Sequence, residues 1–217
     1  MIGYARIFRW IVFLLATGYC LRTLVFGSYE HFGGPFQYLT HWALFMSSFA
    51  ASRMMALAEG RSTRHWDGFV CATAVINVMV VFLYWRLFLE DPNLVSTDGE
   101  LGPLYLELYL HALGPLLQWI DAVFIHRSFR KLGAPMMWLF GVITAYVLWA
   151  ELALQPMNDT PMGSVTSGLP YPFLSELELA GRSVFYGSNF AVSIVLLVGF
   201  AGLAWMIRRL TRGQEAP

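Results

Sequence analysis

The sequence predicts an all-α integral membrane protein, a bundle of about six transmembrane helices with both termini cytoplasmic. Three observations predict this fold. Hydrophobic residues make up 57% of the chain and charged residues only 13%, with a mean hydropathy of +0.55, which is too apolar for an ordinary soluble domain. The apolar residues also gather in stretches long enough to span a bilayer, and the basic residues gather between alternate stretches.

The apolar stretches define the expected helices, and nothing between them suggests a soluble second domain. One transmembrane domain is therefore expected over residues 1–217. The first stretch lacks the small-residue cleavage site of a signal peptide, so we interpret it as a helix. Each span is close to the roughly 20 residues that a bilayer requires. The expected spans lie near residues 8–26, 36–57, 66–88, 104–125, 136–154 and 183–207.

The basic residues predict the orientation of the bundle. If both termini are cytoplasmic, most of the 14 Lys and Arg residues fall on the inner side, and only Arg22, Arg86 and Arg182 fall outside. Such an excess of inner Lys and Arg is the usual pattern of membrane proteins. All the basic residues except Lys131 are Arg, which we associate with a GC-rich bacterial genome. A multi-pass protein of a bacterial cytoplasmic membrane is expected.

The fourth expected span carries a polar stripe. Glu107, His111, Gly114, Gln118 and Asp121 follow each other at steps of four, three, four and three residues, which is the spacing of one helix face. An ionisable side chain at the centre of a membrane helix costs roughly 2.5 to 3.5 kcal/mol. The stripe is therefore expected to face the bundle interior or a wet cavity. Asp121, near the inner end, is expected to pair with a basic residue of an inner loop.

Polar residues of other spans are expected to converge on His111 in the outer leaflet. The second span, taken to begin at Phe36, turns Gln37 and Thr40 inward, and Thr40 lies at a depth comparable to that of His111. Further candidates for an outward-opening pocket lie near the outer ends of the spans. These are Arg22, Arg86, Glu151, Arg182, Tyr186 and Asn189, and the last three share one helix face. The expected ligand has an apolar body and an anionic or ester head.

A hydroxyl beside an imidazole suits acyl transfer, because a hydroxyl is a weak nucleophile until a neutral base accepts its proton. Thr40 would be the nucleophile and His111 the base. Glu107, one turn before His111, would hold the imidazole in the right tautomer, as the acid does in serine-hydrolase triads. Arginines at the rim would bind a fatty carboxylate or the developing oxyanion.

These residues also have structural interpretations. A helical Thr most often bonds a carbonyl one turn back, which alone would explain Thr40. Glu107 and His111 could pair for stability only, and His41 is either an interfacial residue or a second pocket ligand. The outer loop 155–181, rich in Pro and Gly, fits a lid and an idle loop equally. Three histidines in loops or at helix ends are expected to be solvated: His31, His65 and His126.

Several short segments, taken in order, resemble the androgen-induced protein and ADTRP family of multi-pass membrane proteins. The resemblance spans nearly the whole chain, and the shared order of the segments carries it. The spacing within His111-Ala112-Leu113-Gly114-Pro115 differs by one residue from the animal proteins and looks closer to bacterial membrane relatives. The segments are Gly33-Gly34-Pro35-Phe36-Gln37-Tyr38-Leu39-Thr40, His111, Tyr146-Val147-Leu148-Trp149, Tyr171-Pro172-Phe173-Leu174 and Arg182-Ser183-Val184-Phe185-Tyr186-Gly187-Ser188.

That family hydrolyses fatty acid esters of hydroxy fatty acids (FAHFAs) with a threonine and a histidine. The resemblance implies that Thr40 is the nucleophile and His111 the essential histidine, and it favours a lipid-ester hydrolase. Two rivals stay open: a protein that binds or transports a lipid or small anion without covalent chemistry, and a haem-bearing bundle with His41 and His111 as axial ligands.

The expected partners are a lipid ester substrate and membrane lipids, without nucleic acid, and the sequence sets no oligomeric state. Cys20 and Cys71 lack the paired spacing of a zinc or iron–sulfur site. The sequence therefore predicts no metal and no cofactor.

Overall fold

The computed structural model describes residues 2–95, 101–158 and 168–212. Within these residues every regular element is a helix, so the expected all-α bundle is confirmed. The part of the loop 155–181 that lies within 159–167 is outside the described residues.

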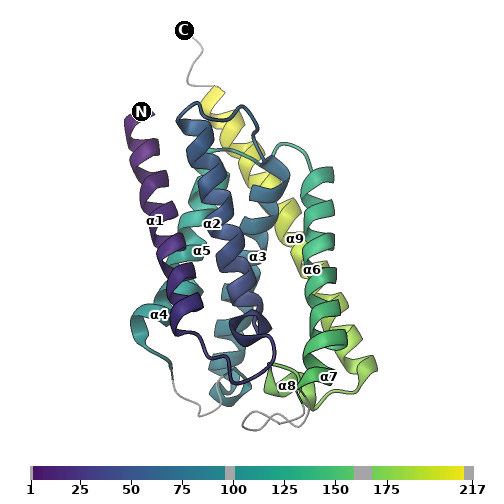
Figure 1. Ribbon diagram of the computed structural model, residues 1–217. Helices are drawn as coiled ribbons and strands as arrows, with labels where there is room; N and C mark the ends of the chain where they lie inside the picture. Colours follow the sequence, from purple (N-terminus) through teal and green to yellow (C-terminus); the bar gives the residue numbers. More distant parts are fainter. Residues whose placement is uncertain (1, 96–100, 159–167, 213–217) are drawn as a thin grey trace.

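Six helical rods form the bundle (Figure 1). The fourth and fifth rods are continuous but contain π-helical turns, η3 to η5, in which one extra residue is accommodated. The rods are α1 (Ile2–Phe26), α2 (Leu39–Ala58), α3 (Asp67–Glu90), the series α4 (Leu104–Leu108), η3 (Tyr109–Leu113), α5 (Gly114–Ile120) and η4 (Asp121–Ile125), the series α6 (Gly133–Trp149), η5 (Ala150–Leu154) and α7 (Gln155–Met157), and α9 (Leu179–Arg212).

Five of these rods are long and apolar enough to cross a membrane. The sixth, α2, has 20 residues, which is the length that a bilayer requires. Thr40, His41 and Arg53 lower the hydropathy of α2. Its neighbours in the bundle are α1 and α3, so α2 lies among the spanning helices.

Helix α1 begins and helix α9 ends at the same end of the bundle (Figure 1). We call this the terminus end and the opposite one the loop end. The arrangement agrees with six crossings, which return the chain to the side on which it started. Which side of the membrane the terminus end faces stays a prediction from the charge pattern.

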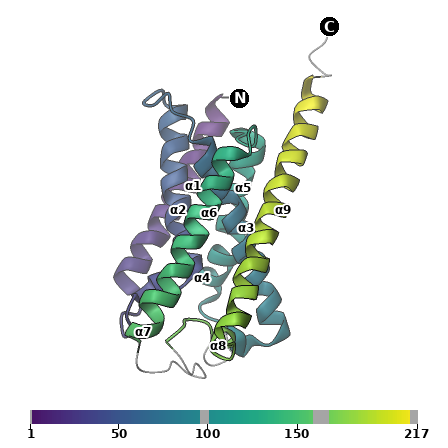
Figure 2. The same cartoon turned by 90° about the vertical axis from the view of Figure 1, so that its right-hand side faces the viewer.

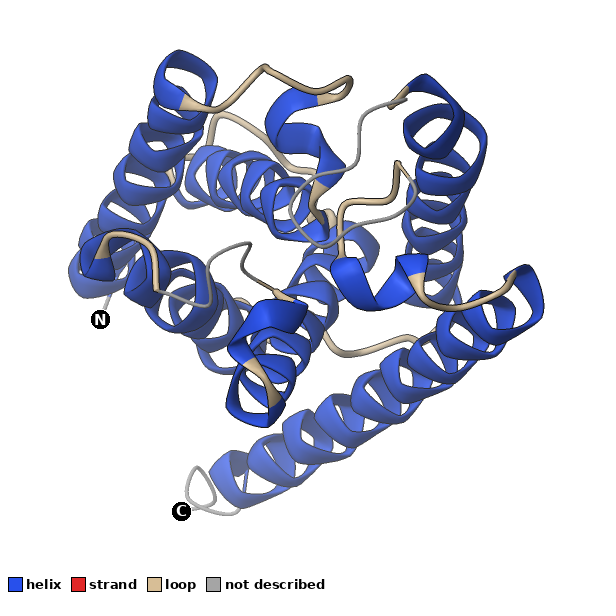
Figure 3. Cartoon of the chain, turned by 90° about the horizontal axis from the view of Figure 1, so that it is seen from below, coloured by secondary structure: helices blue, strands red, loops and turns tan. Residues whose placement is uncertain are grey.

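Helix α3 is the centre of the bundle. It contacts α2, α5, α6 and α9, and 67% of its most apolar stretch is buried, against 17% for α9. Small side chains are fully buried on α3, at Ala72 and Ala74, and on α2, at Ala50. They allow the helices to approach closely. Helix α9 runs obliquely along the outside of the other rods (Figures 2 and 3).

The chain turns sharply before α2 through the 3₁₀ helix η1 (Gly34–Gln37). Gly33 and Gly34 have φ values of 89° and 49°, a left-handed conformation that glycine adopts at little cost. Tyr38 is then extended, and α2 begins at Leu39. The expected start at Phe36 is therefore wrong, and Gln37 is not on the polar face of α2. Two further short helices, η2 (Pro92–Leu94) and α8 (Pro172–Ser175), lie at the loop end.

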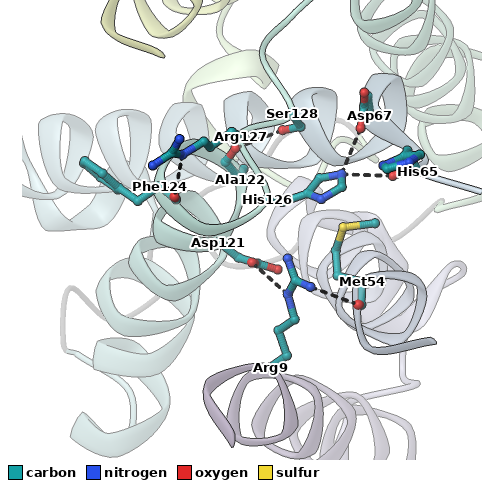
Figure 4. Close-up of polar contacts among 10 residues, drawn as sticks. All are labelled: Arg9, Met54, His65, Asp67, Asp121, Ala122, Phe124, His126, Arg127 and Ser128. Atoms are coloured by element: carbon teal, nitrogen blue, oxygen red, sulfur yellow. Dashed lines mark hydrogen bonds and ion pairs between the residues drawn. The ribbon is translucent and has the colours of Figure 1, made fainter. Parts of the chain in front are cut away.

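A buried ion pair ties three rods together near the terminus end (Figure 4). Arg9 of α1 donates to the Asp121 carboxylate at 3.0 Å and to the carbonyl of Met54 in α2 at 3.3 Å. Asp121 thus pairs with a helix residue and not with the expected loop residue, because Arg9, about two turns inside α1, reaches it. The expectation that His126 is solvated is also wrong, since its side chain is only 6% exposed.

Replacing Arg9 by Met is expected to lower stability by about 3 to 5 kcal/mol, because Asp121 is left as a buried charge without a partner. The double variant Arg9→Met/Asp121→Leu should recover much of this loss. The midpoint of thermal unfolding in detergent measures both effects, with Arg6→Met, an exposed residue of α1, as the control. Equal midpoints for Arg9→Met and Arg6→Met would contradict the role of the pair.

Candidate active site

Thr40 is the second residue of α2, so its hydroxyl sits at the positive end of the helix dipole. The backbone just before it is held by aromatic side chains from α2, α6 and the segment before α8. Trp42 Nε1 and Trp149 Nε1 donate to the carbonyl of Phe36 at 3.0 and 3.1 Å, Tyr146 donates to the carbonyl of Gln37 at 2.8 Å, and the Leu39 amide donates to the Tyr171 hydroxyl at 3.3 Å. Burial raises the pKa of Tyr171 to about 12, so this hydroxyl keeps its proton.

His111 lies in the middle of the π turn η3. Pro115, four residues later, has no N–H to donate to the carbonyl of His111, as a regular helix would require. The indole of Trp85 in α3 donates to that carbonyl instead, at 2.8 Å. π turns in helices often occur at functional sites, and this one turns the His111 ring toward α2.

A row of hydrogen bonds joins α4, η3 and α2. Glu107 Oε2 lies 2.9 Å from His111 Nδ1, and His111 Nε2 lies 3.4 Å from Thr40 Oγ1. If Nδ1 carries the proton toward Glu107, Nε2 is free to accept the proton of the Thr40 hydroxyl. The second contact is long, as catalytic hydrogen bonds often are without a substrate. The three expected catalytic residues are therefore together.

The ring of Tyr84 in α3 stacks on the imidazole of His111, with centroids 3.5 Å apart and planes within 1°. Tyr84 therefore fixes the plane of the His111 ring. Sequence reasoning missed Tyr84 and Trp85, because aromatic residues at the end of a span are typical of the interfacial belt.

Thr40 opens into a cavity of about 100 Å³ between α3, α6 and α9. Its lining is mostly apolar, and it also includes four tyrosines and one asparagine: Tyr84, Tyr146, Tyr171, Tyr186 and Asn189. A second cavity, about 10 Å³, lies on the other side of Thr40 and is also lined by Ser47 and Asn77. It is near the lower size limit for one water molecule. Thr40 thus lies between an apolar cavity and a small polar one.

Arg182 and Glu151 form an ion pair with two hydrogen bonds beside the cavity. The guanidinium donates to both carboxylate oxygens of Glu151, at 2.9 and 3.0 Å, and to the carbonyl of Leu177 at 2.7 Å. Tyr186 donates to the same carboxylate at 2.8 Å. Arg182 is therefore bound by protein groups and holds α9 against η5, an arrangement that positions Tyr186 and Asn189 at the cavity.

Six of the eight expected ligand contacts are not among the described residues that line the cavity. Two of them are the paired Arg182 and Glu151, and the other four make different contacts. Arg86 is exposed on α3, and Arg22 donates to the Tyr105 hydroxyl at 3.1 Å. Gln37 turns back to the carbonyl of Gly34, and His41 is partly buried away from the cavity. His111 uses both ring nitrogens within the row, which leaves neither for a haem iron.

Replacing Trp85 by Phe should lower stability by about 1 to 3 kcal/mol, because the carbonyl of His111 loses its donor. In the double variant Trp85→Phe/Pro115→Ala, the new amide of residue 115 can bond this carbonyl, so part of the loss should return. Trp119→Phe is the matched control, since Trp119 Nε1 is buried without a partner among the described residues. Thermal unfolding in detergent measures the series, and no recovery in the double variant would contradict the argument.

Comparison with known proteins identifies a family. No curated protein and no solved structure shows significant similarity to the chain. The family model described as FAR-17a/AIG1-like protein matches residues 6–204, which include every site residue described above. The resemblance to androgen-induced protein and ADTRP is thereby confirmed, and that family is linked to hydrolase activity. The chain therefore belongs to the FAR-17a/AIG1-like family of membrane proteins.

Proposed function

We propose that the protein is an intramembrane threonine hydrolase of lipid esters, and that FAHFAs are its substrate class. The observation that carries the proposal is the row Glu107–His111–Thr40 beside a mostly apolar cavity within a membrane bundle. The family match supports hydrolysis in general, and the resemblance of the ordered segments supports FAHFAs.

In the first step, His111 Nε2 accepts the proton of Thr40 while Oγ1 attacks the ester carbonyl carbon. Glu107 stabilises the imidazolium that forms. The tetrahedral oxyanion is stabilised by the positive end of the α2 dipole. When the intermediate collapses, the ester C–O bond breaks, and His111 gives its proton to the leaving hydroxyl of the hydroxy fatty acid.

In the second step, water attacks the acyl group on Thr40 while His111 accepts one proton from this water. The bond to Oγ1 breaks, the proton returns to Thr40, and the fatty acid leaves. The small polar cavity beside Thr40 is a suitable place for such a water. Tyr186 and Asn189 contact the substrate at the cavity wall, and Arg182 supports them through Glu151 rather than binding the carboxylate itself.

Thr40→Ala and His111→Ala are each expected to lower kcat by at least about 10³-fold, and Glu107→Gln by about 10² to 10⁴-fold, because the row acts as a unit. The assay measures hydroxy fatty acid released from a FAHFA by purified protein in detergent, with folding checked by size-exclusion chromatography. Folded Thr40→Ala with full activity would refute the nucleophile. A wild type inactive on several ester classes would favour the lipid-binding protein.

A fluorophosphonate probe directed at ester hydrolases should label the wild type covalently at Thr40, because only an activated hydroxyl reacts with it. Labelling should disappear in Thr40→Ala and fall strongly in His111→Ala. Thr17→Ala is the control, since the Thr17 hydroxyl bonds Ser48 at 2.9 Å and lies outside the cavity lining. Mass spectrometry of the labelled peptide identifies the site, and label on another residue would argue against the proposal.

A further inference from the structure

Three side chains with metal-binding atoms lie close together (Figure 4). They lie where α3 begins and η4 ends, which is the terminus end, whereas the candidate active site lies toward the loop end. His65 lies in the loop after α2, Asp67 is the first residue of α3, and His126 directly follows η4. One potential ligand atom from each residue lies within 4.8 Å of the others. We call these three residues the inner histidine cluster.

The cluster is held by two turns of unusual conformation. Trp66, between His65 and Asp67, has φ 54°, and Arg127, just after His126, has φ 55°. These are the two described non-glycine residues with positive φ, a region that residues with a Cβ atom rarely occupy. Both turns thus lie directly beside the cluster and set the direction of its side chains.

Within the cluster, His126 and Asp67 form a hydrogen bond that can stabilise the fold without a metal ion. His126 Nε2 lies 2.8 Å from Asp67 Oδ1 and 3.1 Å from the backbone carbonyl of His65. The His65 imidazole is different. It is exposed, lies face to face with the His126 ring at 5.9 Å between centroids, and makes no hydrogen bond among the described contacts. A free imidazole beside an imidazole–carboxylate pair is what a metal ion would use.

We propose that His65, Asp67 and His126 bind a divalent transition-metal ion such as Zn²⁺, with the remaining coordination position taken by water. Two imidazoles and a carboxylate are a common donor set for such ions. Zinc bonds of 2.0 to 2.1 Å place tetrahedral ligand atoms about 3.3 Å apart. The His126–Asp67 contact of 2.8 Å must widen slightly, and the exposed His65 ring must rotate inward. The metal then replaces the proton shared by His126 and Asp67.

The nearby positive charges are engaged with other groups. Arg9 pairs with Asp121, Arg64 stacks 4.3 Å over the ring of Trp66, and Arg127 bonds the carbonyl of Phe124 at 3.4 Å. The bound ion would join the loop between α2 and α3 to the end of the fourth rod. The site is independent of the proposed hydrolysis, and it departs from the sequence prediction of no metal.

Zn²⁺ binding to the full chain, purified in detergent without a polyhistidine tag, is measured by isothermal titration calorimetry. One ion per chain is expected for the wild type. His65→Ala and Asp67→Asn should each bind Zn²⁺ at least about tenfold more weakly. Even the loss of a residue that only hydrogen-bonds a metal ligand weakens metal binding by about this factor. His31→Ala, which removes a histidine outside the cluster, should bind as the wild type does.

Two further readouts separate metal binding from a folding defect. His65→Ala keeps the backbone carbonyl that His126 bonds, so this variant should remain folded by size-exclusion chromatography. Zn²⁺ should raise the unfolding midpoint of the wild type and of His31→Ala, but not that of His65→Ala. The proposal is overturned if the wild type shows no saturable binding, or if folded His65→Ala and Asp67→Asn bind Zn²⁺ as tightly as the wild type.

Discussion

Polar groups inside this bundle depend on partners within the protein, because lipid offers none. Three ionisable residues that the membrane rods carry lie in π turns: His111 in η3, Asp121 in η4 and Glu151 in η5. Each is paired, with Glu107, Arg9 and Arg182 respectively. The π turns and the pairs therefore occur together, and the pairs decide how the rods fit against one another.

The same constraint explains the surroundings of Thr40. The turn through η1 exposes backbone groups that no helix satisfies, and four aromatic side chains bond them. Three of these side chains, Tyr146, Trp149 and Tyr171, belong to the short segments that resemble the family. Segments that are far apart in the sequence thus share one task, which is to fix the start of α2 beside His111.

The sequence was sufficient for the parts of the fold that depend on periodicity and length. The six spans agree with the helices to within a few residues at most ends, and the polar stripe is buried at His111, Gln118 and Asp121. The pairing of Thr40 with His111 also followed, because two helices of known direction place both at similar depth. Tertiary contacts decided the rest. Arg182 was expected to bind a ligand, but Glu151 occupies it, and spacing alone gives no sign of a pair 31 residues apart.

The turn η3 contains one residue more than a regular helical turn. Its hydrogen bond joins residues five apart instead of four apart, from the Gly114 amide to the carbonyl of Tyr109. A helix with such a turn can gain or lose one residue there, while the rods before and after it keep their faces toward the bundle. A relative with one residue fewer between His111 and Pro115 is therefore expected to differ in the winding of this turn, without a break in the helix.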